Sequence, residues 1–238
     1  MVVILHYHYN SLILASMPLS ADILYYDIHT HNLQREEGSL QIVNAYNGFS
    51  HVVAEGGYCS IGLHPWYLSN YETDLAEITE LASQDNVLAI GECGLDKICK
   101  TDWQLQVTAL RSQIRLADTI RKPLIIHCVR ACNELLEIFR EMQPKVPAII
   151  HGFNKKGTIA QTLLDNGFYL SFGAAMLNDR APINDVVKGI GAEHFFLETD
   201  TADIRIAGIY KKAAEIRQTS EEEIILQQRK NFKTVFSL

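Results

Sequence analysis

From residue 24 onward, short apolar runs alternate with longer segments in which apolar residues recur at helical spacing. This alternation is typical of βαβ units, which build a mainly parallel sheet. A weaker strand candidate, Gln41–Ala45, lies between the first two strong ones. The strong strand candidates are Ile23–Ile28, Tyr58–Leu63, Val87–Gly91, Pro123–Ile126, Pro147–Ile150, Phe168–Phe172 and Phe195–Glu198.

Amphipathic stripes predict the helices between these strands. The longest stripe starts after Asp102, and Pro123 stops it. Its apolar positions are Trp103, Val107, Leu110, Ile114 and Ala117. Similar stripes predict helices near residues 75–82 and 135–142, and a helical pattern occurs near 209–216. The acidic residues 221–223 after Ser220 suit the amino terminus of a final helix and its dipole.

Length and composition fit one large core. The chain has 238 residues, 47% of them hydrophobic, and single-domain α/β barrels commonly reach this size. No repeat or linker divides it, so we expect one domain over residues 23–238 behind an amino-terminal extension over residues 1–22. The formal net charge of -7 provides no long-range positive field for a polyanion. Any nucleic-acid partner would therefore have to be held locally.

The amino-terminal extension matches no targeting signal. It is largely apolar but is interrupted by His6 and His8, and no basic residue occurs before Arg35. A secretory signal needs a basic start, and a membrane span needs roughly 18 apolar residues. We therefore expect a cytoplasmic protein without membrane contact, with Met17 as a candidate natural start. Because His6 and His8 lack an adjoining aspartate, removing residues 1–16 should leave the fold and metal content intact.

The cysteines do not form a recognisable framework. They are odd in number and contain no CxxC pair, which fits neither a disulfide scaffold nor a cysteine zinc site. We expect unreactive thiols in a reducing cytoplasm at Cys59, Cys93, Cys99, Cys128 and Cys132.

Polar residues recur at the carboxyl ends of the apolar strands. In the segment Asp27-Ile28-His29-Thr30-His31, residues two apart share one face, so the two imidazoles form a ready pair of metal ligands. Later runs close in the same way, on Glu92, His127, His151 and Asp200. The carboxyl ends of the strands of a parallel barrel meet at one rim, so these residues should converge.

Each of these residues has an ordinary structural explanation when it is considered alone. A histidine at a strand end is usually hydrogen-bonded within the fold, and an aspartate there often caps a helix. Together they are harder to explain, because burying them without cations would leave several polar groups unpaired, at about 1–3 kcal/mol each. Metal coordination removes this difficulty.

Six motifs in this order resemble the TatD family of metal-dependent hydrolases, over about residues 24–236. The motifs are Asp27-Ile28-His29-Thr30-His31, Gly62-Leu63-His64-Pro65-Trp66, Gly91-Glu92-Cys93-Gly94-Leu95-Asp96, His127-Cys128-Val129-Arg130, His151-Gly152-Phe153 and Glu198-Thr199-Asp200. The resemblance implies a TIM-type (β/α) barrel of the amidohydrolase kind. It also implies two divalent metal ions and hydrolysis of phosphodiesters, with deoxyribonuclease activity in some members.

The resemblance assigns the metal ligands by position. One ion would be held by His29, His31 and Asp200 and the other by His127 and His151, with Glu92 as the bridge. Two ions roughly 3.5 to 4 Å apart lower the pKa of a shared water toward about 7, so that hydroxide can attack phosphorus. Asp200 is then a candidate general base as well as a ligand, and forms the catalytic pair with Glu92. Mixed nitrogen and oxygen ligands suit Zn, Mn, Co or Mg, so the metal identity stays open.

His64 and Arg130 are the candidates for binding the substrate phosphate, Arg130 by a bidentate pair. A surface ion pair is the alternative for Arg130, and a solvated loop is the expected setting of Lys155 and Lys156. Relatives usually carry a proline and a longer loop after the Glu-Thr-Asp motif, whereas residues 201–204 here lead directly toward a helix. Because that loop helps to wall the substrate site, the substrate is left as a phosphodiester or a small molecule, with single-stranded DNA among the candidates. The oligomeric state is also open.

Other function classes remain as alternatives. A phosphatase of the polymerase and histidinol phosphatase type also opens with an Asp-x-His-x-His strand, but the motifs around His64 and Glu92 favour TatD. An amidohydrolase acting on a carbon–nitrogen bond often bridges its metals with a modified lysine, whereas the third strong strand here ends at Glu92. A non-enzymatic metal-binding scaffold is least expected, because loss of activity usually removes a ligand.

Overall fold

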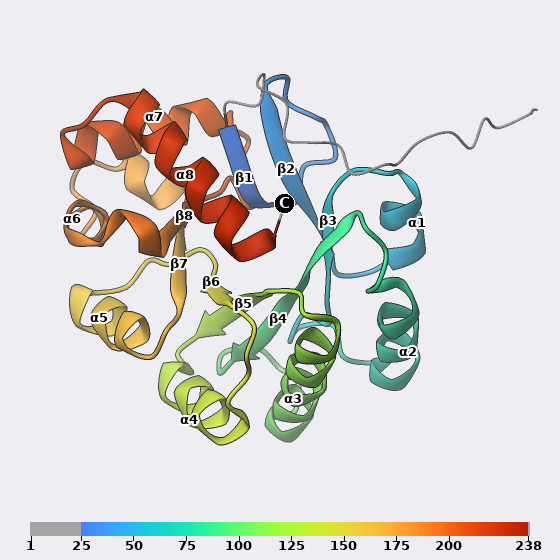
Figure 1. The fold of residues 1–238 in the computed structure, drawn as a ribbon. Coiled ribbons are helices and arrows are strands. Elements are labelled where there is room, and N and C mark those ends of the chain that lie inside the picture. The colour runs from blue at the N-terminus through green and yellow to red at the C-terminus, as the bar shows by residue number, and fades with distance from the viewer. Residues whose placement is uncertain (1–24, 238) are drawn as a thin grey trace, which may run out of the picture.

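The computed structural model describes residues 25–237, and in this part of the chain eight parallel strands follow one another around a barrel (Figure 1). The strands are β1 Tyr25–Thr30, β2 Ser39–Ala45, β3 Cys59–Ile61, β4 Val87–Asp96, β5 Leu124–Val129, β6 Ala148–Ile150, β7 Tyr169–Phe172 and β8 Phe195–Leu197. They lie in chain order, and each is hydrogen-bonded to the next. The predicted TIM-type (β/α) barrel is therefore confirmed, including the weaker strand candidate, which is β2.

Helices surround the barrel on its outer side (Figure 1). They are α1 Phe49–Ala54, α2 Tyr71–Leu81, α3 Trp103–Ile120, α4 Cys132–Met142, α5 Gly157–Asp165, α6 Ile183–Gly189, α7 Ile206–Arg217 and α8 Glu221–Phe236, with 3-10 turns η1 Ala174–Leu177 and η2 Ala192–His194. The predicted helices correspond to α2, α3, α4, α7 and α8. The shorter helices α1, α5 and α6 were not predicted, because they have fewer turns over which an apolar stripe can repeat.

The amino-terminal caps agree with the sequence. The side chain of Asp102 accepts a hydrogen bond from the Leu105 N–H at the start of α3. Ser220 and Glu223 form a reciprocal capping box at the start of α8. These side chains satisfy backbone donors that a helix amino terminus leaves without partners.

Strand β4 is longer than the predicted run, which ended at Gly91. The chain continues to Asp96, because residues 93–96 pair in parallel with residues 126–129 of β5. Gly94 lies inside this strand, and a Cβ atom there would stand 1.9 Å from the carbonyl oxygen of His127. Glycine at this point therefore allows a close approach of two backbones rather than a turn. As a consequence Glu92 lies within a strand and not at its end.

The barrel closes between β1 and β8 at the carboxyl-terminal rim. The His31 N–H donates to the Asp200 carbonyl at 2.9 Å, and the Asp200 N–H donates to the His29 carbonyl at 2.9 Å. A parallel bridge between Thr30 and Asp200 records the same contact. The backbone that closes the barrel thus also carries three of the proposed metal ligands.

The opposite end of the barrel is covered by α8, which crosses in front of the strands in Figure 1. Phe232 and Phe236 of this helix pack in one buried cluster with Tyr26, Leu40 and Leu88, which lie near the starts of their strands. A larger cluster fills the space between the strands and the surrounding helices. Because α8 occupies the amino-terminal end, access to the barrel interior is left at the carboxyl-terminal end.

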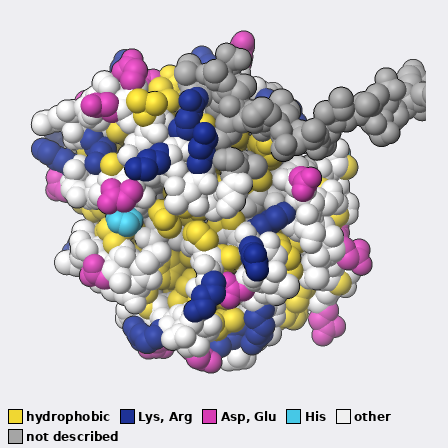
Figure 2. Space-filling view, in the orientation of Figure 1, with side chains coloured by type: hydrophobic (Ala, Val, Ile, Leu, Met, Phe, Trp, Pro, Cys, Tyr) yellow, Lys and Arg dark blue, Asp and Glu magenta, His cyan; other side chains and the backbone are white. Residues whose placement is uncertain are grey.

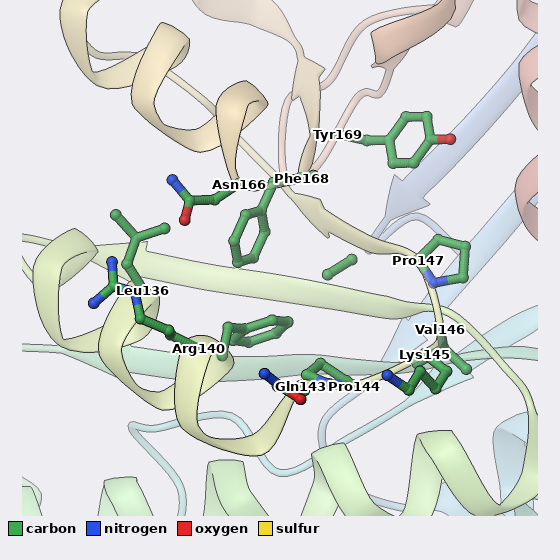
Figure 3. Close-up of a pocket in the computed structure, with 13 residues that line it drawn as sticks. Leu136, Arg140, Gln143, Pro144, Lys145, Val146, Pro147, Asn166, Phe168 and Tyr169 are labelled. Atoms are coloured by element: carbon green, nitrogen blue, oxygen red, sulfur yellow. The ribbon is translucent and has the colours of Figure 1, made fainter.

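The face of the molecule that α8 covers lies away from the predicted metal ligands. Figure 2 shows basic side chains around a hydrophobic centre on the uncovered part of this face, where histidines are scarce. A hollow of about 440 Å³ opens where the chain enters β6 and β7, and Figure 3 shows Arg140, Lys145 and Phe168 on its walls. This hollow lies at the amino-terminal ends of the strands, away from the predicted ligands.

The amino-terminal extension, residues 1–22, lies outside the described residues, together with the predictions made for His6, His8 and Met17. Within residues 25–237, no helix has the length and apolarity to cross a membrane.

Candidate metal centre

The structure brings the predicted ligands together at the carboxyl-terminal rim. His29 lies in β1 and His31 follows it, Glu92 lies in β4, and His127 lies in β5. Of the remaining two, His151 directly follows β6, and Asp200 lies three residues after the end of β8. Six side chains from five strands therefore meet in one place, although they span more than half of the sequence.

Glu92 lies at the middle of this cluster, and its two carboxylate oxygens face different histidines. Oε2 is 3.5 Å from His29 Nε2 and 3.8 Å from His31 Nε2. Oε1 is 2.8 Å from His127 Nδ1 and 2.7 Å from His151 Nε2. One carboxylate thus joins two groups of imidazole nitrogens.

Asp200 completes the group around His29 and His31. Its Oδ1 lies 3.7 Å from His29 Nε2 and 3.5 Å from His31 Nε2. About 38% of the Asp200 side chain is exposed, whereas His29 is fully buried. Asp200 is therefore the member of this group that a molecule entering from solvent would meet.

Unpaired buried nitrogens support a metal at this position. Neither ring nitrogen of His29 has a hydrogen-bond partner in the described part of the chain, although both are buried. His29 Nε2 also belongs to two compact ligand groups, one with His31 and Glu92 and one with His151 and Asp200. An imidazole nitrogen that lies near two carboxylates without a hydrogen-bond partner fits a divalent cation bound between them.

The electrostatics of the centre favour positive charge. Burial raises the pKa of Glu92, but the charge of His151 and hydrogen bonds from His127, His151 and His31 outweigh it, so the pKa lies well below its usual range. Burial lowers the pKa of His151, yet the charges of Glu92 and Glu198 raise it well above its usual range. Both shifts favour positive charge beside the Glu92 carboxylate, and a bound metal cation would also supply such a charge.

Other polar residues hold the predicted ligands in position. Glu198 Oε1 lies 3.5 Å from His151 Nδ1 and accepts the Gly152 N–H at 2.7 Å. Asp96 Oδ2 lies 3.3 Å from His127 Nε2, so that Nδ1 is the nitrogen left to face Glu92. Such contacts set the tautomer and the orientation of ligating histidines.

Asn44 of β2 is a positioning residue that the sequence analysis missed. Its side-chain oxygen accepts the Glu92 N–H at 2.8 Å and the Ser60 hydroxyl at 3.2 Å, and its Nδ2 lies 3.5 Å from Glu92 Oε2. The signal available in the sequence was a polar residue inside an apolar strand candidate. That signal does not identify a partner 48 residues away.

Asp27 lies beside the centre but not in it. Its carboxylate accepts the Thr199 N–H at 3.0 Å and the Thr199 hydroxyl at 2.6 Å. Burial is the main cause that raises the pKa of Asp27, to about 7. Asp27 therefore joins β1 to the residue before Asp200, in agreement with an orienting role.

The two predicted substrate residues differ in their placement. His64 is buried, with Nε2 3.1 Å from Glu92 Oε1. Its Nδ1 accepts the Trp66 N–H at 3.1 Å, which places the proton on Nε2 and makes that nitrogen a donor. His64 also forms a compact group with Glu92 and His127, but a protonated Nε2 suits a phosphate oxygen better than a metal ion. Arg130 is exposed after β5, and no ion pair joins it to another described residue.

Comparisons with known proteins agree with this geometry. The family model described as TatD related DNase matches residues 28–237. An uncharacterized metal-dependent hydrolase of Bacillus subtilis is 31% identical over 199 residues, which cover 76% of this chain and 78% of that protein. A protein of Klebsiella pneumoniae named 3'-5' ssDNA/RNA exonuclease TatD is 32% identical over 151 residues, 61% of this chain and 57% of that protein.

Among solved structures, a TatD homologue of Escherichia coli superimposes with a TM-score of 0.81 and 21% identity, covering 91% of this chain and 99% of that one. This likeness concerns the fold. The family match and the relative from Bacillus subtilis extend over most of the sequence, and the histidines and carboxylates of the matched motifs cluster at the open end of the barrel. The chain therefore belongs to the TatD family of metal-dependent hydrolases.

Proposed function

We propose that this protein hydrolyses phosphodiester bonds with two divalent metal ions bound on either side of Glu92. The observation that supports this most directly is the division of the Glu92 carboxylate, with Oε2 toward His29 and His31 and Oε1 toward His127 and His151. A single carboxylate between two sets of imidazoles suits a bridge between two cations.

In this proposal, His29, His31 and Asp200 would hold the first ion, and His127 and His151 would hold the second. Divalent ions bound there supply Lewis acidity toward a phosphate and acidify water near neutral pH. The donors are imidazole nitrogens and carboxylate oxygens, which suit Zn, Mn, Co or Mg.

Asp200 and Glu92 are the proposed catalytic residues. Burial raises the pKa of Asp200, but the His29 imidazole 3.7 Å away lowers it below its usual range, so the carboxylate is ionised at neutral pH. Its partial exposure allows it to accept the proton of the attacking water. Glu92 is buried and surrounded by histidines, so its role is to hold the two halves of the centre together.

The substrate phosphate is proposed to contact His64 and Arg130. With its proton on Nε2, His64 can donate a hydrogen bond to a phosphate oxygen beside Glu92. Arg130 follows His127 by three residues and is exposed, which leaves its guanidinium group available for a bidentate contact.

Relatives in the family point to the substrate class. The Klebsiella pneumoniae relative is named as an exonuclease of single-stranded DNA and RNA. We therefore propose single-stranded nucleic acid as the phosphodiester, held by local contacts at the rim because the chain as a whole is acidic.

A hydrolysis screen tests the proposal. The protein, stripped and then reloaded with Mn, Zn, Co or Mg, would be assayed on single-stranded DNA, a simple phosphodiester, phosphomonoesters and amides. We expect turnover of the diesters, with chelator-treated protein as the inactive control. Faster turnover of monoesters or amides than of diesters would replace the proposal with a phosphatase or an amidohydrolase.

A further inference from the structure

An aromatic group borders the metal centre and has no role in the catalysis proposed above. Trp66 and Tyr67 follow β3, and 52% and 48% of these residues are exposed. Within residues 25–237 no other aromatic residue is exposed to this degree. Two large apolar rings left in solvent next to a catalytic centre usually mark a binding surface.

These aromatic rings lie next to histidines of the metal centre. Tyr67 stacks on Tyr46, with ring centroids 5.0 Å apart and planes 23° from parallel. Tyr46 lies 5.7 Å from the His31 ring, and Trp66 lies 6.0 Å from the His127 ring. The aromatic residues therefore form a wall along one side of the metal centre, above β2 and β3.

The exposed indole is held in a fixed place. Trp66 Nε1–H donates to Asp96 Oδ2 at 2.7 Å, and the same oxygen lies 3.3 Å from His127 Nε2. Asp96 is itself fixed, because its N–H donates to the buried side chain of Gln106 at 2.9 Å. A ring that is exposed and also pinned is already ordered before a ligand stacks on it, which reduces the entropic cost of binding.

Cationic residues follow two other strands at the same rim. Arg130 follows β5 and is exposed, and Lys155 lies five residues after the end of β6. The rings thus follow β2 and β3, and these cationic residues follow β5 and β6, at the rim that carries the proposed phosphate position. A single nucleic-acid strand could match both groups of residues, because its flat bases can stack on aromatic rings and its phosphates attract cations.

We propose that Trp66 and Tyr67 form a stacking platform for an unpaired nucleobase next to the scissile phosphate. This inference rests on the proposed phosphodiesterase function and adds the residues that select a single strand. A base in a duplex has both faces stacked and its edge paired, so only an unpaired base can place a face on these rings.

The test uses two probes, hexathymidylate and a hexamer of abasic residues with the same phosphates. The first measurement is fluorescence of metal-depleted protein, in which no cleavage takes place. The chain has two tryptophans, so Trp103→Phe leaves Trp66 as the single indole. We expect hexathymidylate to quench the Trp66 emission and the abasic hexamer to leave it unchanged.

The second measurement is cleavage of both probes by metal-loaded variants. Trp66→Ala and Tyr67→Ala should lower kcat/KM on hexathymidylate by about tenfold to a hundredfold more than on the abasic hexamer. Trp66→Phe, which keeps a ring but not the bond to Asp96, should retain part of the preference. Leu226→Ala removes an exposed apolar side chain on α8, at the far end of the barrel, and should change neither rate.

The outcomes separate the two proposals. Equal losses on both probes would mean that Trp66 only holds Asp96 and His127, and would overturn the platform, as would no loss on either. If the wild type cleaves neither probe, the phosphodiesterase proposal fails, and the quenching by itself decides whether a base binds to Trp66.

Discussion

Asp200, three residues after the end of β8, has a left-handed backbone with φ of 52°. Aspartate and asparagine tolerate this conformation better than most residues, because their short polar side chains bond locally. Asp200→Asn therefore keeps the backbone, the side-chain volume and one oxygen for a metal, while it removes the charge and the proton acceptor.

We expect Asp200→Asn to lower the phosphodiesterase rate by about a hundredfold to ten thousandfold, the usual loss when a general base is removed. Part of the metal should remain bound. Rate and metal content, the latter by elemental analysis, would be measured on the same preparation. Near-normal turnover would show that another group accepts the proton.

Cys132 is the thiol that the structure distinguishes from the others. Its Sγ lies 3.4 Å from that of Cys128, and the two residues approach where β5 leads into α4. The hydrogen bond with Cys128 lowers the pKa of Cys132 to about 7, against burial and with help from Lys155. The sequence analysis expected all five thiols to be unreactive. It searched for the CxxC motif, in which the cysteines are three positions apart, whereas Cys128 and Cys132 are four positions apart.

A lowered pKa raises the thiolate fraction at neutral pH, and the thiolate is the form that alkylating reagents attack. The rate of Cys132 alkylation by iodoacetamide should therefore rise through about pH 7 and level off above it. Buried Cys59, whose pKa burial raises to about 12, should react more slowly. Peptide mass spectrometry would follow each site, and unchanged labelling in Cys132→Ser would assign the fast reaction to a different cysteine.

Helix α3 also carries a buried polar residue that the apolar stripe did not predict. Gln113 is fully buried on its barrel side, where its side chain accepts the Leu63 N–H at 2.7 Å and donates to the Leu63 carbonyl at 3.2 Å. Leu63 directly precedes His64. A polar side chain inside an apolar stripe thus fixes the backbone that carries a proposed substrate residue.

Gln113→Leu should leave both backbone groups of Leu63 without partners, at a cost of about 1–3 kcal/mol in the free energy of unfolding. His64 should also lose its position, so that activity falls together with stability. Urea unfolding would measure the first effect, with exposed Gln104→Leu on the same helix as the control. If both variants unfold at the same urea concentration, the Gln113 bonds do not stabilise this loop.

At the scale of the whole molecule, metal binding should stabilise the closed barrel. Thr30 and Asp200 form the bridge between β1 and β8, so an ion held by His29, His31 and Asp200 would tie the first strand to the last. A ligand at about 100 times its Kd adds about 2.7 kcal/mol to the stability of the folded state. For a chain of this size, each kcal/mol raises Tm by about 2–4 °C.

Adding the preferred metal to stripped protein should therefore raise Tm by several degrees, as measured by scanning calorimetry. Glu92→Gln should reduce this rise and lower the content of both ions, because the charge that offsets the repulsion between them is lost. Two tightly held ions in Glu92→Gln, with an unchanged Tm shift, would remove Glu92 from the bridging position.

The sequence by itself determined the alternation of strands and helices and the residues at the strand ends. These features are local: an apolar run, a helical stripe or a capping serine such as Ser220 has its meaning within one element. The same local reading marked His29, His31, His127, His151 and Asp200, because each stands at or just after the end of an apolar run.

Only the tertiary structure decided how these elements act on one another. The length of β4 depends on its pairing with β5, and so the position of Glu92 inside a strand could not be read from its own segment. The contacts of Asn44 with Glu92 and of Trp66 with Asp96 join residues 48 and 30 positions apart. Such partners are set by barrel closure and strand register, which bring side chains together only after every element has formed and packed.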